Sequence, residues 1–412
     1  MNVIVAVLMA LLAGFGLWLL YREGLLRSRT SWFLAAALLL LSLGARYAVF
    51  DYETLDYQNF LAHWCAFYRE NGGFSALRYQ VGNYNIPYLY LLALFSYIPV
   101  RDLYLIKYVS VVFDVLLAWA VLRLVKRFTE SQARRFASFF AVLFLPTVYL
   151  NGAVWGQCDS IYTALLLLGL AFALEDRPRL SMVMAALAFG FKLQAVFVLP
   201  IYAVLWIKGN IKARHLLIFP LSYVLLVLPA VLAGRPFLDT ITLYFSQTGS
   251  IGSGLNYNSP SIFALIWNVP EKDQALASGL AIGAAFLFLA NMLGIAWINR
   301  KKLSEQAVLA MALLFAIGIP FLLPHMHDRY FFAADILSLV VAFSFPLFSP
   351  AALLVQFASL LGYHAYLKMR YLLFMNNGAV ALIVAFALAL GCFIQGIMGK
   401  APGKKTALPG KK

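Results

Sequence analysis

The sequence predicts an all-α polytopic membrane protein, and three observations support that fold class. Of the 412 residues, 63% are hydrophobic and only 12% are charged, whereas about a quarter of the residues in a soluble domain are charged. The mean hydropathy is +0.83. Apolar runs of about 18 residues or more recur along the whole chain. A water-soluble globule is therefore excluded, and the three widely spaced cysteines give no disulfide framework.

Apolar segments that approach the roughly 20 residues of a membrane-spanning helix occur about thirteen times. We place these predicted spans near residues 3–21, 32–49, 105–122, 137–151, 160–174, 180–194, 195–207, 215–233, 275–298, 304–323, 330–347, 350–367 and 376–397. The first is expected to be retained, because it lacks the basic start and the A-x-A site of a cleaved signal peptide. Residues 1–398 then form a single transmembrane domain, and 399–412 form a basic tail.

The basic residues predict the orientation. Two thirds of the 32 Lys and Arg residues fall in alternate connections, which the positive-inside rule makes cytoplasmic. These connections are 22–31, 123–136, 175–179, 208–214, 299–303 and 398–412. The N-terminus is then expected outside and the C-terminus in the cytoplasm. This sorting accounts for the net charge of +15, so no nucleic-acid partner is expected.

Two outer connections, 50–104 and 234–274, are long. Within the first, apolar residues of 56–71 recur at helical spacing, which predicts a helix lying in the membrane interface and ended by the glycines at 72–73. The apolar stretch 85–99 is interpreted as a second juxtamembrane helix. A span at that position would send every later basic cluster to the outside.

Polar residues near the predicted outer face are the functional candidates, because ionisable groups at membrane depth are costly to bury. Asp56 opens the interfacial helix, where a carboxylate either caps the helix or acts as a base at the membrane boundary. Asp51 and Glu53 are interpreted mainly as solvated loop acids. The turn LNGAVWGQCDS (150–160) carries Trp155, Gln157 and Asp159, which suit either a plain turn or sugar recognition.

The other two polar clusters contain cations. Lys192 and Gln194 lie at the outer end of a span, where a lysine either snorkels to the interface or binds an anion. The segment LPHMHDRYFFAAD (323–335) combines two histidines with Asp328 and Arg329. An arginine suits a phosphate leaving group because it stays charged and forms paired hydrogen bonds. A metal bound by the histidines or a simple helix-end charge cluster are the alternatives.

Two aspartates, Asp114 and Asp335, lie inside predicted spans, and we expect them to pair with Arg or Lys of a neighbouring helix. The Gly, Ser and Asn-rich segment 246–261 is interpreted either as a mobile loop over a site or as a plain connector.

From about residue 50 to residue 340, the chain resembles the GT-C glycosyltransferases, polytopic enzymes that use polyprenyl-phosphate sugars. Asp56-Tyr57 with His63-Trp64 is similar to the acidic start of their first outer loop. Phe191-Lys192 followed by Pro200 is similar to an F-K motif of glucosyltransferases of N-glycan assembly, with one residue more between Lys and Pro. His327-Asp328-Arg329-Tyr330-Phe331 looks like a bacterial form of their His-acid motif. The extra N-terminal span and the absence of a large outer C-terminal domain are departures.

The resemblance implies a GT-C-type bundle with juxtamembrane helices in its first outer loop. It also implies an inverting transfer of a hexose, with mannose or glucose favoured, from a polyprenyl-phosphate donor to a lipid-linked or cell-envelope glycan. On this hypothesis Asp56 is the catalytic base, and Arg329, His327 and Lys192 bind the donor phosphate. The candidates for sugar or acceptor contacts are Asp51, Trp155, Gln157, Asp159, Gln194, His325, Asp328 and Asn256.

No cofactor is expected, and a divalent metal is compatible with the residues but not required by them. The expected partners are the donor, the glycan acceptor and membrane lipids, at the extracytoplasmic face of a prokaryotic plasma membrane. Two other function classes fit a polytopic chain. A transporter or lipid flippase would use the intramembrane aspartates as coupling acids, and a lipid-linked glycan ligase or polymerase would carry an outer loop rich in Arg and His.

Overall fold

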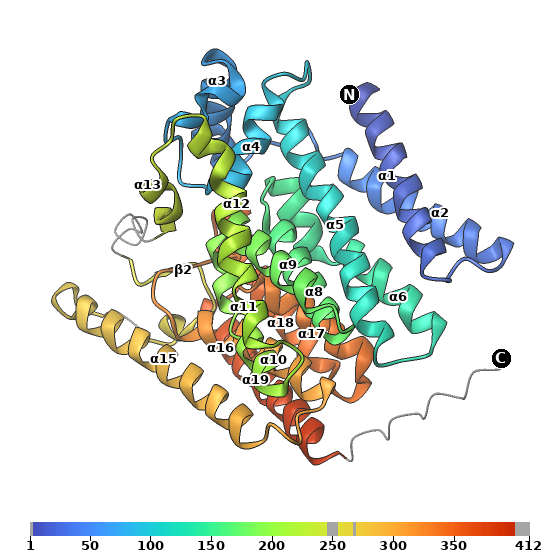
Figure 1. The fold of residues 1–412 in the computed structure, drawn as a ribbon, viewed down its shortest axis with the longest axis vertical. Helices are drawn as coiled ribbons and strands as arrows, with labels where there is room; N and C mark the ends of the chain where they lie inside the picture. Colours follow the sequence, from blue (N-terminus) through green and yellow to red (C-terminus); the bar gives the residue numbers. More distant parts are fainter. Residues whose placement is uncertain (1–2, 245–253, 267–268, 400–412) are drawn as a thin grey trace.

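The structure is a computed structural model that describes residues 3–244, 254–266 and 269–399. Most of the described residues are helical (Figure 1). The α-helices are α1 Val3–Arg22, α2 Arg29–Tyr47, α3 Ala62–Glu70, α4 Ile86–Phe95, α5 Asp102–Lys126, α6 Gln132–Leu143, α7 Pro146–Tyr149, α8 Asp159–Leu174, α9 Pro178–Phe191, α10 Ile201–Lys208, α11 Ala213–Leu216, α12 Ile218–Leu232, α13 Phe237–Ile241, α15 Gln274–Ile298, α16 Glu305–Leu322, α17 Phe332–Ser344, α18 Pro350–Leu367 and α19 Met375–Met398.

Short irregular elements join these helices. Two π-helical turns cover Tyr57–Leu61 and Leu150–Trp155. The 3-10 turns are Gly73–Arg78, Leu193–Phe197, Ile262–Ala264, Glu271–Asp273 and Pro346–Phe348. Two strands of two residues each, β1 Asn256–Tyr257 and β2 Met326–His327, pair in parallel. The basic tail, apart from Gly399, and residues 246–253 of the predicted loop lie outside the described residues.

The all-α polytopic fold class is confirmed. Among the described residues, 8 helices are long and apolar enough to cross a membrane, or up to 9 if α6 and the following Pro146–Trp155 form one span bent by 41°. Four further apolar helices, α4, α8, α9 and α17, are shorter. The expected thirteen full-length spans are therefore not reached by length alone, although a helix lies at each predicted position.

The predicted span 195–207 is the clearest difference in the membrane region. Helix α9 ends at Phe191, and Lys192 is extended with φ −155° and ψ 134°. A 3-10 turn and Pro200 follow, and α10 begins only at Ile201. The chain thus breaks at the point where it carries Lys192, and the broken backbone lets this lysine leave the helix axis. Non-helical backbone at membrane depth is tolerated where it lines a cavity.

The helices differ strongly in burial. Helix α8 packs between α5 and α9, while α16 packs against α19 and α17 against α18. In the apolar window of α16, 78% of the residues are buried, against 22% for α15. Helix α15 lies along one edge of the molecule and the α1–α2 pair along another (Figure 1), so their exposed apolar faces are suited to lipid.

The connections sort to two ends of the molecule. At one end, ion pairs join residues of separate basic connections: Lys126 with Glu23 at 2.7 Å, Arg123 with Glu175, and Arg127 with Glu305. At the other end lie α3, α4 and the first residues of α1 (Figure 1). There, Arg69 pairs with Asp102 and Arg101 with Glu53. The predicted interfacial and juxtamembrane helices therefore occupy one end, without α4 crossing the bundle.

The two intramembrane aspartates have different surroundings. Asp114 Oδ2 lies 3.0 Å from Arg46 Nε, and Ser160 Oγ donates to Asp114 Oδ1 at 2.6 Å. This is the expected ion pair between neighbouring helices. Asp335 is fully buried and forms no ion pair among the described residues, so the expectation of a cationic partner is wrong for it. Its surroundings are polar and neutral, with Thr147, Gln356 and Ser359 close by.

Candidate active site

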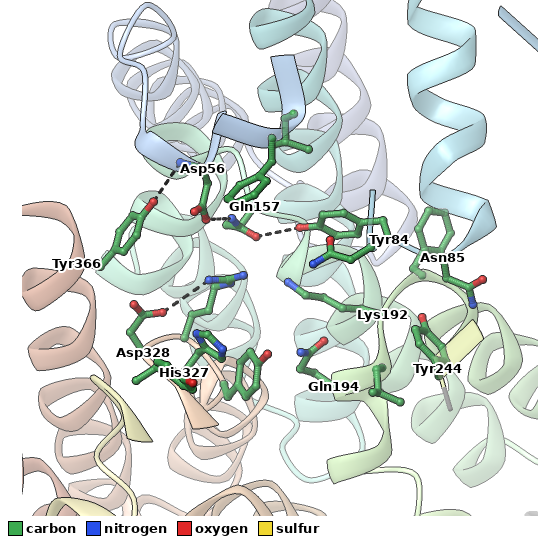
Figure 2. A pocket seen from close by; sticks show the side chains of 18 of the residues that line it. Asp56, Tyr84, Asn85, Gln157, Lys192, Gln194, Tyr244, His327, Asp328 and Tyr366 are labelled. Atoms are coloured by element: carbon green, nitrogen blue, oxygen red, sulfur yellow. Dashed lines mark hydrogen bonds and ion pairs between the residues drawn. The ribbon is translucent and has the colours of Figure 1, made fainter. Parts of the chain in front are cut away.

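A cavity of about 540 Å³ lies at the boundary between the bundle and the loop end that carries α3 and α4. Its volume is in the range of small-molecule sites. Chain segments far apart in sequence line it, and Figure 2 shows their side chains pointing toward one another. The predicted site residues among its lining are Asp56, Gln157, Lys192, Gln194, His327, Asp328 and Arg329.

Asp56 is held by two side-chain donors. Trp155 Nε1 donates to Asp56 Oδ2 at 2.8 Å, and Gln157 Nε2 donates to the same oxygen at 2.9 Å. The backbone of Asp56 is helical and its side chain makes no capping bond. The main-chain N–H of Asp56 donates to the hydroxyl of Tyr366 at 3.2 Å. The capping alternative is thus not what the geometry shows, because the carboxylate points into the cavity toward Gln157.

The turn that supplies Trp155 and Gln157 has a local cause. A π-helical turn ends at Trp155, and Gly156 follows with φ +77°, a conformation that disfavours any side chain. The chain changes direction at Gly156, and this change brings the Gln157 amide beside the indole of Trp155. Ser110 Oγ on α5 donates to the carbonyl of Gln157 at 2.8 Å, and this bond anchors the turn to the bundle.

Asp159 organises the two cations of the site. Lys192 Nζ donates to Asp159 Oδ1, and Arg329 Nε lies 3.6 Å from Asp159 Oδ2. Asn151 Nδ2 also donates to Oδ2 at 2.7 Å. Asp159 is 1% exposed and lies behind the wall, whereas both cations line the cavity. One buried carboxylate therefore holds two cations. Arg329 Nη1 also lies 3.6 Å from Asp328 Oδ1, so the net charge at the cavity depends on whether Asp328 is protonated.

The 327–329 segment has shifted protonation equilibria. Burial and the neighbouring Arg329 lower the pKa of His327 to about 4, so its imidazole is neutral at physiological pH. Burial raises the pKa of Asp328 to about 7 in spite of Arg329. For Arg329, burial opposes the charged form, but Asp159 and Asp328 outweigh it and raise the pKa. Arg329 is therefore a permanent cation, and His327 acts as a hydrogen-bonding group without charge.

The two short strands fix this segment in place. Tyr257 pairs in register with His327, and their rings stack with centroids 4.7 Å apart. The main-chain N–H of His325 donates to Leu255 O at 2.8 Å. Part of the connection 234–274 is thus attached directly to the segment that carries Arg329.

Three predicted site residues lie away from the cavity. Asp51 is exposed and accepts a hydrogen bond from the Tyr104 hydroxyl. The His325 ring contacts Gly254 O at 2.7 Å through Nδ1, and Asn256 makes two local bonds with the main chain of Ser259. These polar groups are used in contacts within the protein, and only those of Asn256 are local in sequence. His63 is likewise exposed and does not line the cavity.

Trp155 reaches the site only through its N–H. It is 1% exposed, and the ring of Tyr366 stacks on it at 3.9 Å with planes 9° apart. The guanidinium of Arg329 lies over the same indole, 5.0 Å from its centre. Both contacts cover the ring, so Trp155 provides no free face for a sugar, and its aromatic surface instead supports Arg329.

Sequence reasoning missed several aromatic residues of the wall. Tyr366, Trp64, Tyr84 and Tyr244 line the cavity. The Tyr84 hydroxyl donates to Gln157 Oε1 at 3.2 Å and so extends the network of Asp56. Trp64 was noted as part of the helical stripe of 56–71 and of the resemblance at His63-Trp64, but not as a site residue. A lone tyrosine near a helix end, such as Tyr366, carries no signal in a chain with 16% aromatic residues.

Within the described ranges, no group of three or more His, Cys, Asp or Glu side chains is arranged to hold a metal ion. The site combines one carboxylate held by two N–H donors with two cations that contact a buried acid. That combination can accept a proton from a hydroxyl and bind an anionic group in the same cavity.

Comparison with known proteins identifies the family of the chain. The model of glycosyltransferase family 87 matches residues 83–324, which is more than half of the chain. The matched part includes Gln157, Asp159 and Lys192, while Asp56 and Arg329 lie outside it. No curated protein and no solved structure matches the chain. The resemblance to a GT-C-type glycosyltransferase is confirmed at the level of the family, and the chain belongs to glycosyltransferase family 87.

Proposed function

We propose that this membrane glycosyltransferase is an inverting enzyme that moves a hexose, mannose or glucose, from a polyprenyl-phosphate donor to a lipid-linked or cell-envelope glycan. The observation that carries the proposal is the position of Asp56. This carboxylate shares one cavity with Lys192 and Arg329, so a base and a receptor for a phosphate face the same space.

In the proposed reaction, Asp56 takes the proton of an acceptor hydroxyl, and the oxygen attacks the anomeric carbon of the donor. The bond between this carbon and the phosphate oxygen breaks, and its electron pair stays on the polyprenyl phosphate. The phosphate leaves already ionised, so no general acid is needed and one carboxylate suffices. Attack from the side opposite the phosphate inverts the configuration.

The cations serve the leaving group. Arg329 and Lys192 are assigned to the phosphate, and neutral His327 adds a hydrogen-bonding contact. Preorganised cations in a site shielded from water stabilise charge that develops in the transition state. Gln194 lines the same wall between these groups and the far end of the cavity (Figure 2) and is assigned to a sugar. The reaction requires no metal.

The distribution of charge supports an extracytoplasmic reaction. The basic connections gather at the end away from α3 and α4, and by the positive-inside rule that end faces the cytoplasm. The cavity then opens at the outer face of a plasma membrane, with the N-terminus outside and the C-terminus inside. A prokaryotic membrane fits the short connections of the chain.

The transporter or flippase alternative is less well supported. Asp114 is held by Arg46 and Ser160, and the family assignment is to a transferase. The alternative of a glycan ligase or polymerase, which also transfers glycan at the outer face, is separated by its donor. A ligase uses a whole lipid-linked glycan, so it would leave a labelled polyprenyl-phosphate monosaccharide unchanged.

The decisive experiment uses membranes that contain the protein and radiolabelled polyprenyl-phosphate mannose or glucose. We expect label to appear on an acceptor in the wild type. The conservative Asp56→Asn variant should reduce transfer by at least about 10²-fold, the usual contribution of general base catalysis, with donor binding unchanged. Wild-type turnover by Asp56→Asn would refute the base. Label that crosses the bilayer on an intact donor would instead support a flippase.

A further inference from the structure

The wall of the cavity that faces away from the 327–329 segment differs in chemistry from the cation cluster. Residues of the first outer loop and the segment after α13 contribute it: Phe60, Leu61, Trp64, Asn83, Tyr84, Asn85 and Tyr244. All of these residues are uncharged. In Figure 2, Tyr84, Asn85 and Tyr244 lie on the opposite side from His327 and Asp328. We call Trp64, Tyr84 and Tyr244 the aromatic wall.

We propose that the aromatic wall is the acceptor subsite and that it takes a neutral pyranose ring. The acceptor hydroxyl to be glycosylated then belongs to an uncharged sugar residue and not to a phosphate-bearing or acidic group. This inference rests on the proposed function, because it assumes that Asp56 is the base and that the donor phosphate occupies the cation cluster.

Trp155 has no surface on which a sugar ring could pack. A sugar ring packs on an aromatic ring that has an open face. Trp155 has none, since Tyr366 and Arg329 cover it. Trp64, in contrast, is half-buried and lines the cavity. The indole that can meet a substrate is therefore the one in α3.

Packing contacts hold the rings of the aromatic wall in fixed positions. Gly82 has φ +68°, and a Cβ placed there would lie 2.3 Å from Cε2 of Trp64. The loop before α4 thus packs its backbone directly against the indole and holds it in place. Tyr84 meets the edge of the same indole, with centroids 5.7 Å apart, and stacks on Tyr88 at 4.4 Å. These contacts preorganise two rings for a ligand.

Hydrogen bonds connect the aromatic wall to Asp56. The Tyr84 hydroxyl donates to Gln157 Oε1, and Gln157 Nε2 donates to Asp56 Oδ2. A ring packed on Trp64 and Tyr84 therefore lies one amide away from the base. The three rings of the aromatic wall carry no charge, and the nearest cations, Lys192 and Arg329 (Figure 2), are the ones assigned to the donor phosphate. A second phosphate at the wall would therefore lose its hydration without a cation of its own, which is costly.

The test measures transfer from labelled polyprenyl-phosphate mannose to two soluble probes: neutral methyl α-mannopyranoside and anionic mannose 6-phosphate. The neutral probe should accept the sugar and the anionic probe should not. Trp64→Ala should raise the KM for the neutral probe about tenfold or more, the loss expected when one good aromatic contact is removed. Trp64→Phe should recover most of that loss. Donor binding should change less than about twofold in both variants.

A second variant and a control variant distinguish loss of the subsite from misfolding of the protein. Gly82→Ala leaves Trp64 in the chain but pushes the indole out of place, so it should raise the same KM. Phe74→Ala alters an exposed ring of the same outer loop that stacks on Tyr97 outside the cavity, and it should leave the KM unchanged. Saturation-transfer NMR with the neutral probe measures binding directly, should transfer to so small an acceptor be too slow.

The outcomes separate this proposal from the proposed function. An unchanged KM and unchanged NMR binding in Trp64→Ala, with normal use of the donor, would refute the subsite alone. Faster transfer to mannose 6-phosphate than to the neutral probe would refute the neutral ring. A wild type that neither binds nor cleaves the polyprenyl-phosphate donor would refute the proposed function itself.

Discussion

Two buried charge clusters lie in neighbouring helices, and they differ in stoichiometry. In the first cluster, between α2 and α5, Arg46 Nε lies 3.0 Å from Asp114 Oδ2, and the hydroxyl of Ser160 donates to the other oxygen of this carboxylate. In the second, Asp159 is shared by Lys192 and by Arg329, which remains 3.6 Å away. The first cluster pairs one cation with one acid. Asp328 Oδ1 also lies 3.6 Å from Arg329 Nη1, so the second cluster has a surplus of positive charge only while Asp328 is protonated.

The two clusters also differ in their access to the cavity. Arg46 and Asp114 are completely buried and do not line the cavity, whereas Lys192 and Arg329 do line it. A balanced, closed pair holds helices together, whereas the open cluster presents the two cations that our proposal assigns to an anion. Intramembrane charge alone does not indicate function. The ratio of charges and the access to a cavity distinguish the two roles.

The strongest test of this contrast breaks the closed pair. Arg46→Met leaves Asp114 buried without a counter-charge, so we expect a loss of about 3–5 kcal/mol in the free energy of unfolding. Thermal unfolding in detergent should show it, while transfer per folded molecule stays within about twofold. In the double variant Arg46→Met with Asp114→Leu, most of the stability should return. Loss of transfer in that stable double variant would mean that the first cluster is functional.

A smaller effect is expected when the open cluster is changed. Arg329→Ala removes a charged contact to the donor phosphate, worth about 1.5–3 kcal/mol, or roughly ten- to hundredfold in donor affinity. Lys192 still neutralises Asp159, so the unfolding temperature should fall little. Arg101→Ala is a matched control, because Arg101 pairs with Glu53 away from the cavity. Equal donor affinity in the wild type and Arg329→Ala would contradict the assignment.

The smallest predicted effect is a dependence of donor binding on pH. Burial raises the pKa of Asp328 to about 7, so this carboxyl is neutral below that pH and ionised above it. Its negative charge beside Arg329 should weaken phosphate binding as the pH rises. The change between about pH 6 and about pH 8 should not exceed about tenfold, which is the change in the neutral fraction of such a group.

The variant Asp328→Asn should abolish this dependence. His327 should not contribute, because its pKa of about 4 keeps it neutral over that range. A pH profile that persists unchanged in Asp328→Asn would assign the titration to another group, and the charge ratio of the open cluster would then be independent of pH.

The fold could be predicted well from the sequence because the membrane imposes simple rules. Apolar runs such as those of α1, α5 and α19 must be helical to satisfy their backbone in lipid. The break between α9 and α10 could not be predicted from hydropathy, since Ala195, Val196 and Phe197 are as apolar as the helices around them. Its cause is tertiary: Lys192 turns toward Asp159 on another helix.

Several charged residues that line the cavity could be picked out from the sequence, whereas its aromatic residues could not. Asp56, Lys192 and Arg329 are unusual near a membrane, and their rarity marks them. Trp155 was expected to contact sugar, yet Tyr366, more than 200 positions along the chain, covers its ring. Asn256 resembles a binding residue in sequence, but its amide closes a turn with Ser259. Partners at such distances in the chain leave no local pattern.

The position of Trp155 also matters to anyone who would alter this enzyme. One indole donates a hydrogen bond to Asp56 and supports the guanidinium of Arg329 on its ring. A substitution at position 155 therefore changes the carboxylate and the guanidinium together. Variants selected there for a new donor would inherit a change in reactivity as well. Separate tuning of the two properties has to begin at Gln157 for the carboxylate and at Lys192 for the donor.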